Sequence, residues 1–151
     1  MNSSPQASSP SHSETLAVPS ALRGWFIFHC VADLIFAIPL LVDPAFALGL
    51  LGWDPGSVDP LNARISASAL MGIGIESWLC RDSSVEVYRS MLNLKSIWSI
   101  CAWVSVLWVM LSAEAGQAPW GGWVIFAIFL IFSGVWNGYR VSLSRAALRS
   151  D

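Results

Sequence analysis

The sequence predicts an all-α, polytopic membrane protein built as a four-helix transmembrane bundle. Of its 151 residues, 55% are hydrophobic and only 12% are charged, whereas a soluble domain carries about 25% charged residues. Four apolar stretches follow one another, and each approaches the roughly 20 residues that a helix needs to cross a bilayer. The stretches are continuous and lack the alternation of barrel strands, which indicates helices.

The chain begins with a polar segment that we do not expect to fold. Residues 1–21 are rich in Ser and Pro, and such a segment buries too little apolar area to offset the entropy of ordering it. It also lacks the basic start and apolar core of a secretory signal. We predict a disordered cytosolic tail here, a transmembrane domain over residues 22–140 and a short basic cytosolic tail over residues 141–151.

The predicted spans differ in how apolar they are. They cover about residues 24–42, 61–79, 91–112 and 120–139. Pro39 interrupts the first span near its end, and the second span is the least apolar because it contains Arg64 and Glu76. Residues 44–60 are apolar but too short to cross, so we expect an interfacial turn of helix there.

The positive charges predict the orientation. With four spans, seven of the eight Lys and Arg residues fall on the side of the two termini, and only Arg64 falls on the other side. Cytoplasmic loops of membrane proteins carry such an excess of Lys and Arg. We therefore expect a multi-pass protein whose termini and 81–91 loop lie in the cytosol. The sequence does not indicate which membrane it occupies.

The first candidates for a functional site lie in the middle of the first span. Asp33 occupies a depth from which no side chain reaches water, and His29 lies one turn earlier on the same helix face. An ionisable residue at this depth costs about 2.5–3.5 kcal/mol to insert and commonly marks a functional site. Asp33, His29 and Glu76 are our candidate catalytic residues for acid–base chemistry. The alternative is that Asp33 and His29 form a purely structural pair.

Further polar residues are expected at a similar depth on the other helices. Glu76, Lys95 and Asn137 each lie near the cytosolic end of a span, and Lys95, Asn137 and Arg64 are candidate binding residues. The structural alternative is an ion pair between Glu76 and Lys95, while Arg64, Lys95 and Arg140 extend toward the interface.

The second span carries a polar and small stripe. Arg64, Ser68, Gly72 and Glu76 follow one another at steps of four residues, so they share one helix face. Because lipid cannot satisfy polar groups, we expect this stripe to face the interior of the bundle or a hydrated cavity.

The sequence predicts no cofactor and no metal. Cys30, Cys80 and Cys101 form no CxxC pair and are too dispersed for a zinc site. The second histidine, His12, lies in the tail, so the bundle lacks a histidine pair for haem. A net charge of −2 and a pI of about 5.5 leave no basic surface for nucleic acid.

The expected partners are the lipid bilayer and other membrane proteins. Gly134 and Gly138 form a small-xxx-small pair at the end of the fourth span, and such a pair permits close approach of two helices. The approach could occur within the chain or in a homodimer.

The layout resembles the DoxX-like families and related uncharacterised integral membrane proteins with four spans. The similar features are Arg23-Gly24 before the first span, Pro39 and Pro44 at its end, the Leu/Gly-rich residues 48–52, Arg64, and the small residues 67–74. The resemblance covers residues 22–140 in layout. It implies the four-span architecture, and some members of the group are associated with oxidase or quinone-linked complexes.

Three functions are compatible with these features. Short loops leave no room for a soluble catalytic domain, which favours a non-enzymatic accessory or interaction protein. The alternatives are a membrane-embedded acid–base enzyme, isomerase-like and acting on a lipid-like substrate, and a small proton-coupled carrier. The sequence leaves the substrate and the oligomeric state open.

Overall fold

In the computed structural model the described residues are 18–114 and 117–148, and every regular element among them is helical. The elements are α1 (Ser20–Val42), α2 (Pro44–Gly49), η1 (Pro55–Ser57), α3 (Pro60–Leu79), η2 (Cys80–Asp82), α4 (Val85–Ser112) and α5 (Trp120–Ala147). The tail predicted to be disordered spans residues 1–21; residues 1–17 of it lie outside the described part, as do residues 149–151 of the predicted basic tail. The prediction is wrong for Ser20 and Ala21, which form the first turn of α1. Residues 141–147 of the basic tail continue α5.

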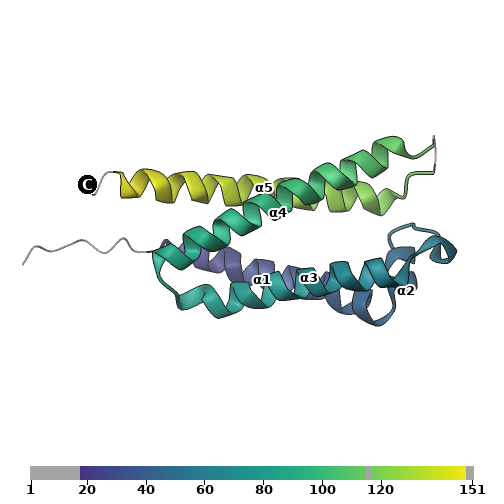
Figure 1. Cartoon of the computed structure of the whole chain (residues 1–151), viewed down its shortest axis with the longest axis horizontal. Helices are drawn as coiled ribbons and strands as arrows, with labels where there is room; N and C mark the ends of the chain where they lie inside the picture. Colours follow the sequence, from purple (N-terminus) through teal and green to yellow (C-terminus); the bar gives the residue numbers. More distant parts are fainter. Residues whose placement is uncertain (1–17, 115–116, 149–151) are drawn as a thin grey trace, which may run out of the picture.

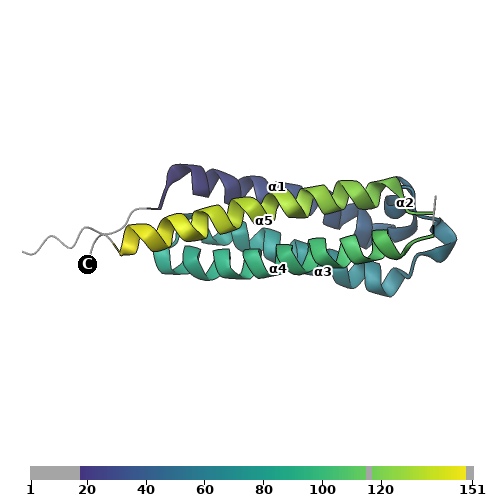
Figure 2. The same ribbon diagram turned by 90° about the horizontal axis from the view of Figure 1, so that it is seen from above.

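The four long helices lie in two pairs. α1 packs along α3, and α4 packs along α5; the pairs form the lower and upper layers in Figure 1. η2 and the turn after it connect the pairs at the end where α1 begins and α5 ends, which we call the terminal end (Figures 1 and 2). The opposite end, which holds α2 and η1, is the α2 end.

Three of the four predicted spans are confirmed as helices long and apolar enough to cross a membrane. They are Ser20–Val42, Val85–Ser112 and Trp120–Ala146. α3 has 20 residues but is too polar to belong to this group. It nevertheless packs against α1 more extensively than any other helix does. A fourth span therefore stays a prediction.

A repeated Asp-Pro sequence starts the three helices at the α2 end. Asp43, Asp54 and Asp59 each stand at the N-cap position, and a proline follows each at the start of the helix. Their carboxylates accept bonds from backbone N–H groups of Phe46 at 3.1 Å, Gly56 at 3.1 Å and Leu61 at 2.9 Å. Asp satisfies the free N–H groups of a first turn, and Pro has the φ that this turn needs. The helical turn expected within residues 44–60 is thus confirmed as α2.

Aromatic side chains fill the space between the two pairs toward the terminal end. Phe26 from α1 lies 4.6 Å from Tyr88 of α4 and 5.9 Å from Trp136 of α5, measured between ring centroids. Trp136 stacks on Phe132 at 5.7 Å with nearly parallel rings. These four side chains are buried together with Leu22 and Leu92, among others. Burial of large rings contributes much of the packing energy of such a core.

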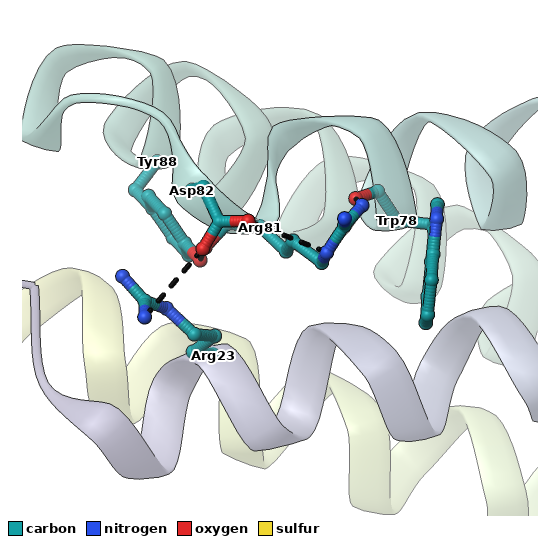
Figure 3. A network of polar contacts seen from close by, with 5 residues as sticks. All are labelled: Arg23, Trp78, Arg81, Asp82 and Tyr88. Carbon is teal, nitrogen blue, oxygen red and sulfur yellow. Dashed lines mark hydrogen bonds and ion pairs between the residues drawn. The ribbon is translucent and has the colours of Figure 1, made fainter.

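A polar network fixes the connection between the pairs (Figure 3). The Tyr88 hydroxyl donates to the Arg81 carbonyl at 2.6 Å, and this bond ties α4 to η2. Asp82 lies 3.5 Å from Arg23 of α1 and 3.4 Å from Arg81, while the Arg81 guanidinium covers the Trp78 ring at 4.3 Å. Exposed ion pairs contribute little energy individually. We therefore infer that the main role of the network is to fix the conformation of η2 and the turn after it.

Candidate functional site

A lysine is buried between the two helix pairs. Lys95 comes from α4 and is only 1% exposed. Its Nζ donates to the Ser77 hydroxyl of α3 at 2.6 Å and lies 3.0 Å from Nδ1 of His29 on α1. The same ammonium group lies 5.0 Å from the centroids of both Phe26 and Trp136. Hydrogen bonds and aromatic faces thus replace the water that a buried cation loses.

His29 and Asp33 form the predicted pair on α1. Nδ1 of His29 lies 2.9 Å from Oδ2 of Asp33, and both residues are buried. The imidazole also packs edge-on against Phe132 and Trp136, with ring centroids 4.7 and 5.1 Å away. Two aromatic neighbours therefore fix the imidazole in a position that brings Nδ1 between Lys95 and Asp33.

This single nitrogen lies between two polar groups. Nδ1 can accept a hydrogen bond from Lys95 or donate one to Asp33, but a ring nitrogen has only one proton or lone pair to use. The imidazole is therefore within hydrogen-bonding distance of both an amine and a carboxylate. Such an arrangement can pass a proton between a carboxylate and an amine through an imidazole.

The pair lines an apolar cavity of about 270 Å³. Among the residues that the structure describes, His29 and Asp33 bring the ionisable groups to its wall, and the other lining residues are apolar. They come from α1, α2, the segment after α2, α3 and α5, and include Phe36, Leu48, Leu70 and Ile128. The cavity extends from the polar residues toward the α2 end, where the Gly121 N–H donates to the Leu51 carbonyl at 2.9 Å. Ligand pockets are typically apolar with a few polar groups that fix orientation.

A glycine makes room for Asp33. A Cβ atom added at Gly74 of α3 would lie 2.8 Å from Cβ of Asp33 and 3.2 Å from its Oδ2. No real Cβ contact is so short, so only glycine allows α3 to approach α1 at this level. Gly74 and Ser77 belong to the site, and neither was among the predicted site residues. Their spacing could have indicated that they lie together, since residues three apart share a helix face.

The predicted ion pair between Glu76 and Lys95 is wrong. Glu76 is exposed and accepts a bond from the Cys80 thiol at 3.0 Å, while Lys95 contacts the neighbouring Ser77. Burial raises the pKa of the Cys80 thiol, and the bond to Glu76 raises it further. A thiol of this kind stays protonated and packs as a small apolar group.

The polar stripe of α3 also does not face the interior. Arg64, Ser68, Gly72 and Glu76 are all exposed, and the buried residues of α3 are Ala63, Ala67, Gly74 and Ser77. Arg64 donates from Nε to the Leu41 carbonyl at 3.1 Å, near the end of α1. It therefore lies far from Asp33 and stabilises a helix end.

The remaining predicted residues stay outside the cluster. Asn137 donates to the Ser133 carbonyl at 2.8 Å, one turn earlier on its own helix. No atom lies within 4 Å of a Cβ added at Gly134 or Gly138, so this pair makes no close helix contact in the described part of the chain. A homodimer through these glycines stays a prediction. Within residues 18–114 and 117–148, no three His, Cys, Asp or Glu side chains group as metal ligands would.

Comparison of the chain with protein-family models, with curated proteins and with solved structures finds no match.

Proposed function

We propose that the chain is a four-span membrane protein that binds a lipid-like small molecule in the cavity beside His29 and Asp33. The observation that carries this proposal is an apolar cavity whose ionisable lining residues, within the described part of the chain, are His29 and Asp33 of α1. Its walls suit a hydrocarbon, and its polar wall suits the polar end of the same molecule. The exposed apolar side chains of α1, α4 and α5 support immersion in lipid, which would deliver such a ligand.

Acid–base chemistry on this ligand is the second candidate. It is favoured by the position of His29 Nδ1, 2.9 Å from Asp33 and 3.0 Å from Lys95. A ligand held against Asp33 would meet a group able to exchange protons with the bundle interior. The accessory or interaction role expected from the short loops, the carrier role and the resemblance to the DoxX-like families all stay predictions.

The test of binding is to fill the cavity. Ala47 of α2 lines it, whereas Ala45 of the same helix does not. We expect the protein purified in mild detergent to retain a stoichiometric small molecule in native mass spectrometry. Ala47→Phe should lose this molecule and Ala45→Phe should keep it. An empty wild-type cavity, or equal retention by both variants, would overturn the proposal.

The orientation has a separate test. In a chain whose three natural cysteines are replaced by alanine, cysteines at Ser57 of η1 and Ser83 after η2 lie at opposite ends of the helices. We expect Ser83→Cys to react with a membrane-impermeant maleimide only from the cytosolic side, and Ser57→Cys only from the other. Reaction of both from one side would rule out four spans.

A further inference from the structure

The cavity lies beside α1 and α5, two helices of different pairs that approach each other on both sides of it. Toward the terminal end, Phe28 of α1 packs against Phe132 of α5, with ring centroids 6.2 Å apart. At the α2 end, the bond from the Gly121 N–H to the Leu51 carbonyl joins α5 to the segment after α2. A Cβ atom added at Gly121 would lie 2.9 Å from Cα of Leu51, so this contact leaves no gap.

Between these two contacts the cavity opens at the side of the bundle. Ile35 follows Phe28 by seven residues and therefore shares its face of α1. Phe28 packs on α5, but Ile35 lines the cavity and is 64% exposed. Phe36 also lines the cavity and is 38% exposed. Residues that line the cavity and are exposed at the same time mark its rim, so the opening lies between α1 and α5.

The opening connects the cavity with an apolar surrounding. Both α1 and α5 are long and apolar enough to cross a membrane, so in the proposed four-span protein the opening would face the hydrocarbon of the bilayer. Ile35 and Phe36 form the rim on α1, and Ile128 lines the cavity on α5. A hydrocarbon chain therefore passes only apolar side chains between the lipid and the cavity.

The size and charge of the cavity limit its occupant. Its volume of about 270 Å³ is below the roughly 300–1,000 Å³ of pockets that enclose a drug-sized ligand. A long lipid does not fit inside and must extend through the opening. His29 and Asp33 already contact each other, and Lys95 contacts His29. A charged end of the ligand would therefore enter an apolar site without a free partner, which favours a neutral polar end.

We infer that the ligand is a single-chain lipid with a neutral polar end, which enters sideways from the bilayer between α1 and α5. Its polar end lies in the cavity, and its chain extends through the opening into the surrounding lipid. The inference rests on the proposed function and names the ligand class and its route. Methylene groups beyond the opening are in hydrocarbon before and after binding, so a longer chain should change the affinity little.

Photoactivatable probes of two chain lengths test this inference in the full protein in phosphatidylcholine nanodiscs. The probes are saturated C8 and C18 chains, each made as the alcohol, the methyl ketone and the primary amide, with a diazirine beside the polar end. Labelled peptides from α1 and α5 are quantified by mass spectrometry at equal mole fractions of probe, with Ala47→Phe as the background. For the polar end that labels most, we expect C18 and C8 to label within about twofold of each other.

Two tryptophan variants test the route. Ile35→Trp narrows the opening and should reduce labelling by the C18 probe about fivefold or more, as overpacking does. Ile38 is also exposed on α1 but does not line the cavity, so Ile38→Trp should leave the labelling unchanged. Both variants replace exposed residues, so both should purify as monodisperse protein.

The outcomes separate the inference from the proposed function. Labelling by C8 with C18 at the background would show an enclosed cavity, and equal effects of the two tryptophan variants would place the route elsewhere. Either result would overturn the inference and leave the proposed function standing. Labelling by no probe above the Ala47→Phe background would overturn the proposed function itself.

Discussion

Lys95→Met is expected to destabilise the protein by about 3–5 kcal/mol, because removal of one member of a buried charged group leaves the other without compensation. Lys95 is 1% exposed. Its ammonium group, on α4, contacts His29 of α1 and Ser77 of α3. Methionine fills a similar volume, so the loss reports the ammonium and not a cavity. The measurement is reversible unfolding in mixed micelles, together with the amount of monodisperse protein after purification.

Two further variants make this result specific. Arg140 is an exposed cation on α5, and Arg140→Met should leave stability unchanged within about 0.5 kcal/mol. The double variant Lys95→Met with Asp33→Leu removes both charges and should recover most of the loss, since apolar residues can replace a buried ion pair. A double variant that is no more stable than Lys95→Met would show that Asp33 and Lys95 do not depend on one another.

Gly74→Ala is expected to separate α1 from α3 and to displace Asp33. The added Cβ would lie 2.8 Å from Cβ of Asp33, and overpacking of this kind typically costs about 1–3 kcal/mol. Both atoms are Cβ atoms, which are attached directly to a helix backbone. Neither can rotate away as the end of a long side chain could. We expect a lower unfolding temperature and the loss of the ligand that co-purifies with the wild type.

Gly72 provides the matched control on the same helix. No atom lies within 4 Å of a Cβ added there, so Gly72→Ala should retain both stability and ligand. Both variants replace Gly by Ala in α3, so the change in helix propensity is the same. The difference between their stabilities therefore measures the contact with Asp33. Equal behaviour of the two variants would contradict the close approach of α1 and α3 at Gly74.

Hydropathy predicted where the apolar helices lie better than where they end. α4 begins at Val85, six residues before the predicted span, and α5 continues to Ala147, eight residues beyond it. In these extensions Tyr88 and Leu143 are buried while polar neighbours are exposed. A membrane span is limited by the thickness of the hydrocarbon, whereas a helix continues as long as its backbone bonds and one packed face persist.

The sequence predicted the contact between His29 and Asp33 within α1, but it did not predict which residue of α3 contacts Lys95. His29 and Asp33 meet because residues four apart share a face, and that local rule needs no knowledge of the fold. The partner of Lys95 on α3 is Ser77 and not Glu76, a rotation of about 100°. That rotation is set by Gly74 and Ala67, which are small enough to face the neighbouring helices. The position of a residue along the helix axis carries no information about this rotation.

The division into two helix pairs has a consequence for synthesis. α1 and α3 emerge from the ribosome before α4, so in the proposed four-span protein Asp33 and His29 would enter the bilayer before Lys95 has been synthesised. At about 5–20 residues per second, the first hairpin would wait on the order of seconds before Lys95 can contact His29. Docking of the second hairpin ends this exposure. We expect cellular quality control, which degrades membrane chains with exposed polar groups, to act on this protein mainly in that interval.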